Sequence, residues 1–275
     1  MKKQLRLVSL IVGVLMLCSM SMVSCAEPTT FEIVNDAIVK TQALDSMHAV
    51  SEMNMDMKMD LFGMSVPMEI PMKMDIKASG LQGDNPVMNM GMSLEMMDEE
   101  IAFDSYLEGE YLYISVMGEN MKVKSEEMGS MYDARAQIDG TVQQIPEELL
   151  TDIVAVEKSD GSKAVNLTIP QDQLQTLYGD LLESVQGTAA EGSPVSNLVI
   201  SDAEVEVVIN KDGYVSVYAL TFGMDMTVGE GEEAIDCEID VEMKITYQNP
   251  GEPVTVTPPE GYRDFPEVDA DDVGL

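Results

Sequence analysis

The side chains with the most distinctive chemistry in this 275-residue sequence are its methionine thioethers. Fourteen of the 25 methionines lie between Met47 and Met97. Thioether sulfur is a soft donor suited to Cu(I) or Ag(I), and the flexible methionine side chain also fills irregular cores or lines surfaces that accept varied apolar molecules. Three interpretations of these residues therefore stay open: a filled core, a cavity for an apolar ligand, and a soft-metal site.

Other reactive side chains are scarce. The only histidine, His48, is expected at the end of the first helix, and the thiol of Cys237 lies far along the chain from the methionine-rich segment. Because Cu(I) sites usually include a histidine or a cysteine, this scarcity counts against a metal site. Hydrolysis by a triad needs a base beside the nucleophile, and the sequence has no G-x-S-x-G motif. We therefore expect a protein that is not an enzyme and has no cofactor.

The N-terminus indicates a different chemistry, the lipidation of a cysteine. Three basic residues precede the apolar run over 7–17, which is shorter than the roughly 20 apolar residues that span a bilayer. The tetrapeptide Met22-Val23-Ser24-Cys25 follows, with a small residue directly before the cysteine. This pattern resembles the lipobox of bacterial lipoproteins. The alternative is an ordinary signal peptide that is cut nearby.

The lipobox resemblance implies that residues 1–24 are a lipoprotein signal peptide and that Cys25 carries palmitate or a similar acyl group. Residues 25–30 would then tether the protein to the extracytoplasmic face of the cell membrane, in an envelope of the Gram-positive type. Two acyl chains hold a protein stably on a membrane, whereas one chain binds marginally. Because Cys18 leaves with the signal, Cys237 is the only free thiol expected in the mature chain, and no intramolecular disulfide can form.

The net charge excludes nucleic acid as a partner. Three of the 15 basic residues and none of the 50 acidic ones lie in the first 24 residues, which leaves 12 against 50 and a formal charge of −38 on the mature protein. Such a surface repels phosphate backbones and anionic headgroups, so the lipid tether alone would hold it beside a membrane. The acidity favours solubility and identifies no protein partner.

The spacing of apolar residues predicts the secondary structure. Recurrence at three and four residues predicts a helix over 30–44, and recurrence at two residues from Met53 onward predicts strands with one apolar face. Pro67 and Pro71 fall on the polar face and predict that their segment is an edge, bulged or irregular stretch, because proline has no amide proton for the ladder. The expected strands are 53–59, 64–76, 88–96, 101–107, 111–117, 121–124, 164–169, 198–209, 214–228 and 235–247.

Helices are also expected in the middle of the chain, over 125–156 and from Pro170 onward. With nine or so strands and no alternation of strands and helices, a parallel sheet is disfavoured. The pattern indicates an α+β fold: a curved antiparallel sheet, or half-open β-barrel, with helices packed on its concave side. One β-rich domain is expected over 31–248, followed by an extended, proline-rich and acidic tail over 249–275.

Several of these features occur together over most of residues 30–265. They are a lead helix ending near Ser46-Met47-His48, a strand series over 101–124 that contains Glu110-Tyr111-Leu112-Tyr113, mid-chain helices and a late hairpin over 210–214. With the lipobox, they resemble the LolA/LppX-like lipoproteins, a family that includes uncharacterised Gram-positive lipoproteins. In that family the half-open barrel holds acyl chains or serves a lipid-carrying role, so the resemblance implies such a ligand.

We therefore expect a membrane-anchored lipoprotein that binds a lipid-like or other hydrophobic molecule on a methionine-rich apolar face. The alternatives are an inert surface module, structural or interacting, with a methionine-filled core, and a protein that binds Cu(I) or Ag(I). Alternation shows which face of a strand is apolar but does not show whether that face is filled. The expected ligand-binding residues are Met53, Met55, Met57, Met64, Met68, Met72, Met90, Met92 and Leu94.

Overall fold

The computed structural model describes residues 28–61, 64–83, 85–96, 99–125, 147, 150–174, 195–229 and 234–269. The expected signal peptide, Cys25 and most of the expected tether therefore lie outside the described residues, as do most of the helical region expected over 125–156 and most of the helix expected after Pro170. Within the described ranges, no helix is long and apolar enough to cross a membrane.

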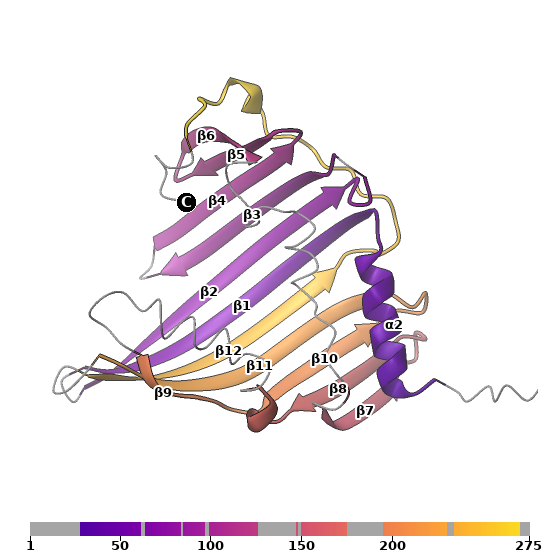
Figure 1. Ribbon diagram of the computed structural model, residues 1–275, viewed down its shortest axis with the longest axis vertical. Helices are drawn as coiled ribbons and strands as arrows, with labels where there is room; N and C mark the ends of the chain where they lie inside the picture. Colours follow the sequence, from indigo (N-terminus) through magenta and orange to yellow (C-terminus); the bar gives the residue numbers. More distant parts are fainter. Residues whose placement is uncertain are drawn as a thin grey trace, which may run out of the picture.

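Helix α2, twelve strands and a helical segment over 171–174, where a helix was expected after Pro170, make up most of the described fold (Figure 1). Their bounds are α2 (Thr30–Gln42), β1 (Ser46–Leu61), β2 (Met64–Ser79), β3 (Val87–Met96), β4 (Glu99–Glu108), β5 (Tyr111–Val116), β6 (Glu119–Lys124), β7 (Thr151–Glu157), β8 (Lys163–Ile169), β9 (Val195–Ile200), β10 (Ala203–Ile209), β11 (Val215–Val228) and β12 (Ile235–Tyr247), with a 3-10 turn, η4 (Tyr262–Asp264), in the tail.

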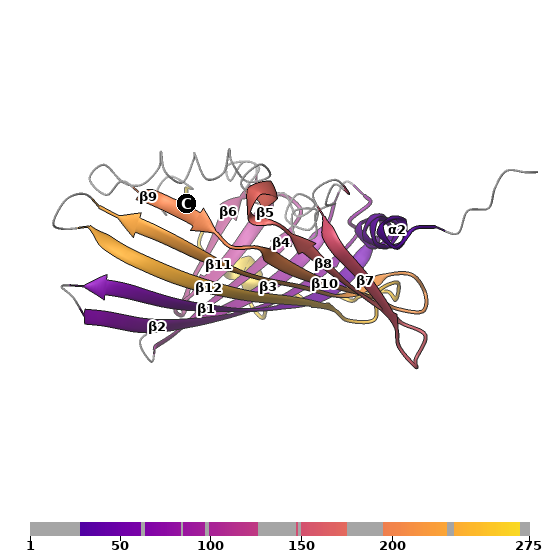
Figure 2. The ribbon, with the colours of Figure 1, turned by 90° about the horizontal axis from the view of Figure 1, so that it is seen from below.

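All twelve strands belong to one antiparallel sheet. The strand order is β6-β5-β4-β3-β2-β1-β12-β11-β10-β8-β7, and β9 pairs with β11 beside this path. The first and last strands of the chain's β region, β1 and β12, are central neighbours, whereas β6 and β7 stand at opposite ends of the order. Figure 2 shows the curvature of the sheet, which does not close on itself. The expected curved, half-open antiparallel sheet of an α+β fold is confirmed.

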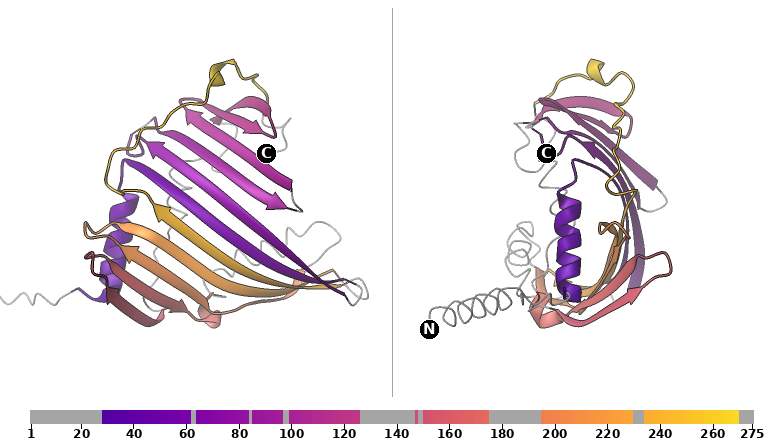
Figure 3. Two further views of the ribbon diagram at one scale, coloured as in Figure 1. Left: turned by 180° about the vertical axis from the view of Figure 1, so that it is seen from behind. Right: turned by 90° about the vertical axis from the view of Figure 1, so that its right-hand side faces the viewer.

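The helix lies on the concave side of the sheet, where it contacts β7, β10 and β11 (Figure 3). It begins with a capping box, in which the Thr29 side chain accepts from the Glu32 backbone and the Glu32 side chain accepts from the Thr29 backbone. Its apolar side is buried against the sheet through Val34, Ala37 and Ile38. The predicted helix is therefore confirmed, and it ends two residues earlier than expected.

A buried threonine fastens the last turn of α2 to the sheet. The Thr41 hydroxyl donates to the Ala37 carbonyl at 2.7 Å and accepts the Val215 backbone N–H at 2.9 Å. Near it, the Lys40 ammonium donates to the Asp212 carbonyl and lies 4.2 Å from the centre of the Tyr214 ring. These contacts fix the helix over the hairpin between β10 and β11.

The two prolines of β2 mark the place where its ladder with β3 stops. In the described residues that ladder runs from Ser79↔Val87 to Met72↔Leu94, whereas the ladder between β2 and β1 continues to the end of the strand. Pro67 and Pro71 lie in the stretch beyond Met72. The predicted edge is thus confirmed on the β3 side, because a residue without an amide proton cannot donate to a ladder.

Two expectations for the strands were wrong. Residues 151–157, expected as the end of a helix, form the edge strand β7, in which β-branched Ile153, Val154 and Val156 suit an extended chain. The strand expected over 198–209 is divided at residues 201–202. There the Ser201 hydroxyl accepts the Gly223 amide, and the Asp202 carboxylate accepts the amide of Gln171.

The described part of the C-terminal tail packs against the sheet through contacts that reach Val268. Its aromatic anchor is Tyr262, whose ring lies 5.0 Å from that of Tyr106 and 4.8 Å from that of Tyr113, on the face opposite α2. Burial, with the nearby Glu108 carboxylate, raises the pKa of Tyr106 to about 12. Beyond this anchor, the Lys122 backbone exchanges hydrogen bonds with Pro266 and Val268, so the tail covers the outer edge of β6.

Candidate functional site

The register places the predicted methionine face on three adjacent strands. Met53 of β1 is paired directly with Met72 of β2, and Met72 is paired with Leu94 of β3. Met57 is paired with Met68 in the same way, and Met92 with Met74. Because directly paired residues have Cβ atoms about 4.5–5.5 Å apart, these side chains form continuous apolar rows across the sheet.

Eight of the nine predicted residues belong to this face and are half-buried: Met53, Met55, Met57, Met68, Met72, Met90, Met92 and Leu94. The ninth, Met64, lies at the first position of β2, next to the β1–β2 turn, and 66% of its surface is exposed. The structure therefore brings eight of the predicted residues together and leaves Met64 at the tip. Sequence analysis missed Met243 of β12, which is paired with Met53 and extends the row by one strand.

The same apolar face is closed at its other end. Met47, Ala49, Ala78, Met88 and Ile245 are each at most 5% exposed and belong to the main hydrophobic core with α2. We call this part the closed end, and we call the half-buried part that begins at Met53 and includes the rows above the methionine end. The two ends lie on the same strands and the same face. They share one alternation of apolar and polar residues and differ in how deeply their side chains are buried.

Ser105 lies at the boundary between the two ends. It belongs to the apolar face of β4, between half-buried Met90 on β3 and fully buried Ile114 on β5. Only 3% of the residue is exposed, yet its hydroxyl has no hydrogen-bond partner. A buried polar group without a partner is costly, so this serine is a polar interruption in an otherwise apolar region.

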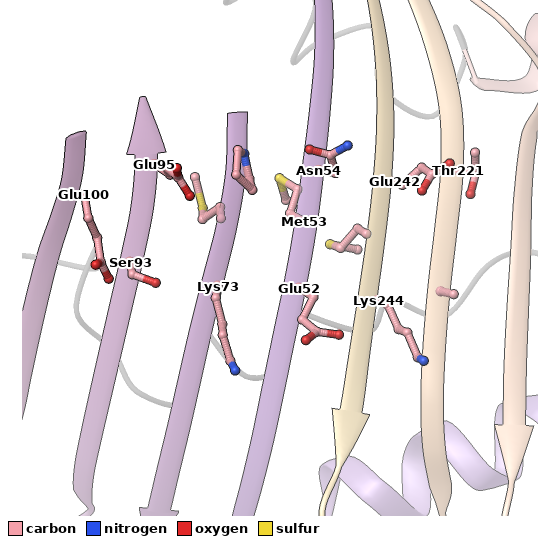
Figure 4. A pocket seen from close by; sticks show the side chains of 14 residues that line it. Glu52, Met53, Asn54, Lys73, Ser93, Glu95, Glu100, Thr221, Glu242 and Lys244 are labelled. Atoms are coloured by element: carbon pink, nitrogen blue, oxygen red, sulfur yellow. The ribbon is translucent and has the colours of Figure 1, made fainter. Parts of the chain in front are cut away.

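A cavity of about 620 Å³ is lined mainly by residues of the opposite, polar face of the sheet, and its lining also includes Met53, Met72 and Met243 of the methionine rows. Its lining includes Lys73, Glu52 and Lys244, which stand side by side because Glu52 is paired with both lysines (Figure 4). One oxygen of Asn54 in this lining is buried without a partner. Sequence analysis missed this cavity, since a polar alternation predicts only a solvated surface. Its walls carry both signs of charge and are largely exposed, so it resembles an open groove.

His48 was expected at the end of the first helix, and that expectation was wrong. The helix ends at Gln42, and His48 is the third residue of β1, where its Nε2 atom lies 3.2 Å from the Asp75 carboxylate on the polar face. The imidazole is therefore on the opposite side of the sheet from the methionines. Across the described residues, no cluster of three or more His, Cys, Asp or Glu side chains could hold a metal ion.

Cys237, which the sequence places far from the methionine-rich segment, lies beside it in the sheet. It is paired directly with Met59 of β1 on one side and with Met226 of β11 on the other. The thiol is free and half-buried, and burial together with the nearby Asp236 carboxylate raises its pKa above the ordinary value. No local sequence signal could have predicted this neighbourhood, because it depends on the register between strands at opposite ends of the chain.

A family model described as "Family of unknown function (DUF6612)" matches residues 29–261, and none of the curated proteins compared matches the chain. Among solved structures, LprF from Mycobacterium bovis is 17% identical, with 84% of this chain and 97% of that chain covered and a TM-score of 0.40.

Two further solved structures are similar at lower values. A putative outer membrane lipoprotein-sorting protein domain from Vibrio parahaemolyticus is 10% identical, with coverages of 81% and 93% and a TM-score of 0.21. A LolA superfamily protein from Nitrosomonas europaea is 9% identical, with coverages of 79% and 93% and a TM-score of 0.19. Because all three TM-scores are below 0.5, the function is argued below from the chain's own residues alone.

Proposed function

The chain belongs to DUF6612, a family of unknown function, and within that family we propose that it is a membrane-anchored lipoprotein that binds a lipid-like molecule at its methionine end. The observation that supports this proposal is the unequal cover of one apolar face. Met53, Met57 and Met72 remain half-buried, whereas residues on the same face at the closed end are almost completely buried.

An apolar ligand would complete the burial of this face. Removing apolar surface from water stabilises a complex by about 25 cal/mol per Å², so an acyl chain along the paired methionine rows gains from every row that it covers. Methionine has three rotatable side-chain bonds and a polarizable sulfur, which allows the lining to repack around chains of different shape. The proposed ligand is therefore a lipid or another flexible hydrophobic molecule, and the proposed activity is carriage or display without catalysis.

The proposed location on the membrane surface suits a lipid-like ligand. A lipid-anchored Cys25 would hold the domain on the extracytoplasmic face of the cell membrane, within reach of membrane lipids. The formal charge of −35 on the whole chain keeps such an apolar-lined protein soluble beside the bilayer. The alternative, an inert surface module, needs neither a free apolar face nor a ligand.

Replacement of Cys25 by alanine tests whether this cysteine anchors the protein to the membrane. We expect the variant to stay as uncleaved precursor or to leave the membrane fraction, because no acyl chain can be attached. Mass spectrometry of the N-terminal peptide and fractionation of cells measure both effects. Unchanged processing with full retention in the membrane would show that Cys25 is not the anchor.

Native mass spectrometry of protein released in mild detergent from its own membrane tests the ligand. Wild-type protein should carry lipid, and the double variant Met53→Glu/Met92→Glu should carry none, because a carboxylate in an apolar site is costly to desolvate. The matched control is Asn54→Glu/Ser93→Glu, which adds the same charges one residue further along the same strands, on the opposite face.

The control variant should retain lipid. Added phospholipid or glycolipid should raise its melting temperature as much as it raises that of the wild-type protein. If the wild-type protein carries no lipid, and added lipid neither binds nor raises its melting temperature, the carrier is excluded and the inert module is the better account. Equal loss of lipid in both double variants would show that the methionine face is not the binding surface.

A further inference from the structure

Three sulfur-bearing residues occupy directly paired positions on neighbouring strands at the methionine end, outside the set proposed to bind lipid. Cys237 is the third residue of β12, and its directly paired neighbours are Met59 of β1 and Met226 of β11. The three strands are consecutive in the sheet, and all three residues are half-buried on the apolar face. Figure 1 shows β1, β12 and β11 side by side, with this end of the three strands far from α2.

The spacing of this trio suits a single small ion. Directly paired residues have Cβ atoms about 4.5–5.5 Å apart, so the cysteine stands between two methionines at that distance on either side. Each methionine sulfur is separated from its Cβ by one further carbon and rotates freely, so it can turn toward the thiol without a backbone change. One thiol and two thioethers can therefore reach one point above β12.

We propose that Met59, Cys237 and Met226 form a binding site for a soft monovalent cation, Cu(I) or its analogue Ag(I). Sulfur donors select such ions over hard or borderline ones. On binding, the thiol of Cys237 releases its proton to solvent and its sulfur forms the bond to the metal, while both thioethers donate lone pairs. The metal keeps its oxidation state, so the step needs no oxidant or reductant.

The charge balance of this site fits its surroundings. One thiolate neutralises one monovalent cation, and the two thioethers are neutral, so the loaded site has no net charge. A neutral centre can lie on a half-buried apolar face without the desolvation cost of an isolated ion. A divalent ion bound by the same three sulfurs would keep a positive charge on that face, which disfavours Zn(II).

The nearest carboxylates in β12 and the histidine of β1 lie on the polar face, opposite the trio. The two carboxylates that flank Cys237 in β12 belong to the polar face, where Asp236 accepts from Thr227 at 2.8 Å and Glu238 pairs with Lys58 at 3.2 Å. His48 lies on that same polar face, near the other end of β1. The trio itself contributes sulfur donors only, which is a ligand set that favours Cu(I).

Anaerobic competition between the protein and a chromophoric Cu(I) chelator tests the site. Protein isolated from membranes in mild detergent should withdraw one Cu(I) per chain, and Cys237→Ser should weaken that binding by about a hundredfold or more, because the only charged soft donor is lost. Met59→Leu and Met226→Leu should each weaken it by roughly tenfold, since each removes one neutral soft donor. The matched control is Met121→Leu, the same substitution at a half-buried position of the same face on β6, away from both the trio and the proposed lipid-binding set.

X-ray absorption of the loaded protein should show a shell of sulfur ligands without nitrogen. Melting curves of the metal-free variants establish that all four fold, because Leu and Met have similar volumes and Ser replaces Cys with little change in size. The proposal is overturned if the wild-type protein takes no Cu(I) from the chelator. It is equally overturned if Cys237→Ser, or the pair Met59→Leu/Met226→Leu, leaves the affinity unchanged. None of these outcomes depends on whether a lipid binds, because the trio shares no residue with the proposed lipid-binding set.

Discussion

The closed end and the methionine end are two parts of one apolar face, carried by the same strands. At the closed end, Met47, Ala49 and Ile245 are at most 5% exposed and pack with α2 into one core. At the methionine end, Met53, Met57 and their paired neighbours stay half-buried. Both ends obey the same alternation of apolar and polar residues, so the difference in burial comes from what covers the sheet.

The difference in burial gives the two ends different roles: the closed end stabilises the fold, and the methionine end is the proposed binding surface. The closed end provides the buried apolar surface that a domain without disulfides needs in order to fold. The methionine end contributes less to folding, because a half-buried side chain has already lost only part of its contact with water. A face that is not needed at full burial for folding is free to be completed by a ligand.

The largest expected contrast comes from one substitution made at both ends. Met88→Ala at the closed end removes a side chain that is 1% exposed and should lower the free energy of unfolding by about 2–5 kcal/mol, because it leaves a cavity. Met57→Ala should cost less, since solvent can fill the space beside a half-buried residue. Urea unfolding of both variants in lipid-free protein measures the two costs. Equal costs would show that the two ends are equally well packed.

Alkaline unfolding should also report on the closed end. Burial, with Tyr218 nearby, raises the pKa of Tyr247 from 10.0 to about 12. The raised value means that the folded state favours the neutral phenol, so stability is unaffected below pH 10 and falls as the pH rises from about 10 to 12. At about 1.4 kcal/mol per unit, the loss approaches ~3 kcal/mol.

Urea midpoints measured across that pH interval check the sign, and Tyr247→Phe removes this contribution. The variant should lose stability less steeply with pH than the wild type, although Tyr106, whose pKa is also raised to about 12, still contributes. The same slope in both proteins would show that the Tyr247 phenol is not held neutral by the core.

Long segments with one clear period could be predicted from the sequence. The helix expected over 30–44 is α2, and the strand expected over 235–247 is β12, because each has a sustained apolar spacing and clear bounding residues. Short or interrupted segments were harder. Residues 151–157 were expected to be helical, and their strand structure depends on pairing with β8, a tertiary contact that local propensity does not contain.

The candidate sites also differ in whether local sequence could predict them. The methionine face could be predicted because alternation alone assigns each residue of a strand to a face. The trio of Met59, Cys237 and Met226 could not be predicted, because it depends on the register between strands far apart in sequence. The unequal burial of the face was equally inaccessible, since alternation is the same at both ends.

Ser105 offers a smaller test at the boundary between the ends. Ser105→Ala removes a buried hydroxyl without a partner and should raise the free energy of unfolding of the lipid-free protein by about 1 kcal/mol. Ser93→Ala, on the polar face of the neighbouring strand, is the control and should change stability very little. Thermal melts of both variants suffice. A loss of stability in Ser105→Ala would show that the hydroxyl is satisfied in the native protein.

The smallest expected effect concerns the polar face behind the methionine end. There Asp56 is paired directly with Glu69 on one side and with Asp240 on the other, whereas Lys77, behind the closed end, lies 3.6 Å from the opposite charge of Asp75 on its own strand. Like charges at directly paired positions destabilise a sheet by roughly 0.2–1 kcal/mol. Asp56→Asn should therefore raise the melting temperature slightly at low salt. The gain should shrink as salt is added, because exposed charges are screened over about 10 Å at 0.1 M ionic strength.

Lys77→Gln, which removes an attractive pair, should change the melting temperature in the opposite direction with the same salt dependence. If both variants shift the melting temperature in the same direction, the charges on the polar face do not distinguish the two ends.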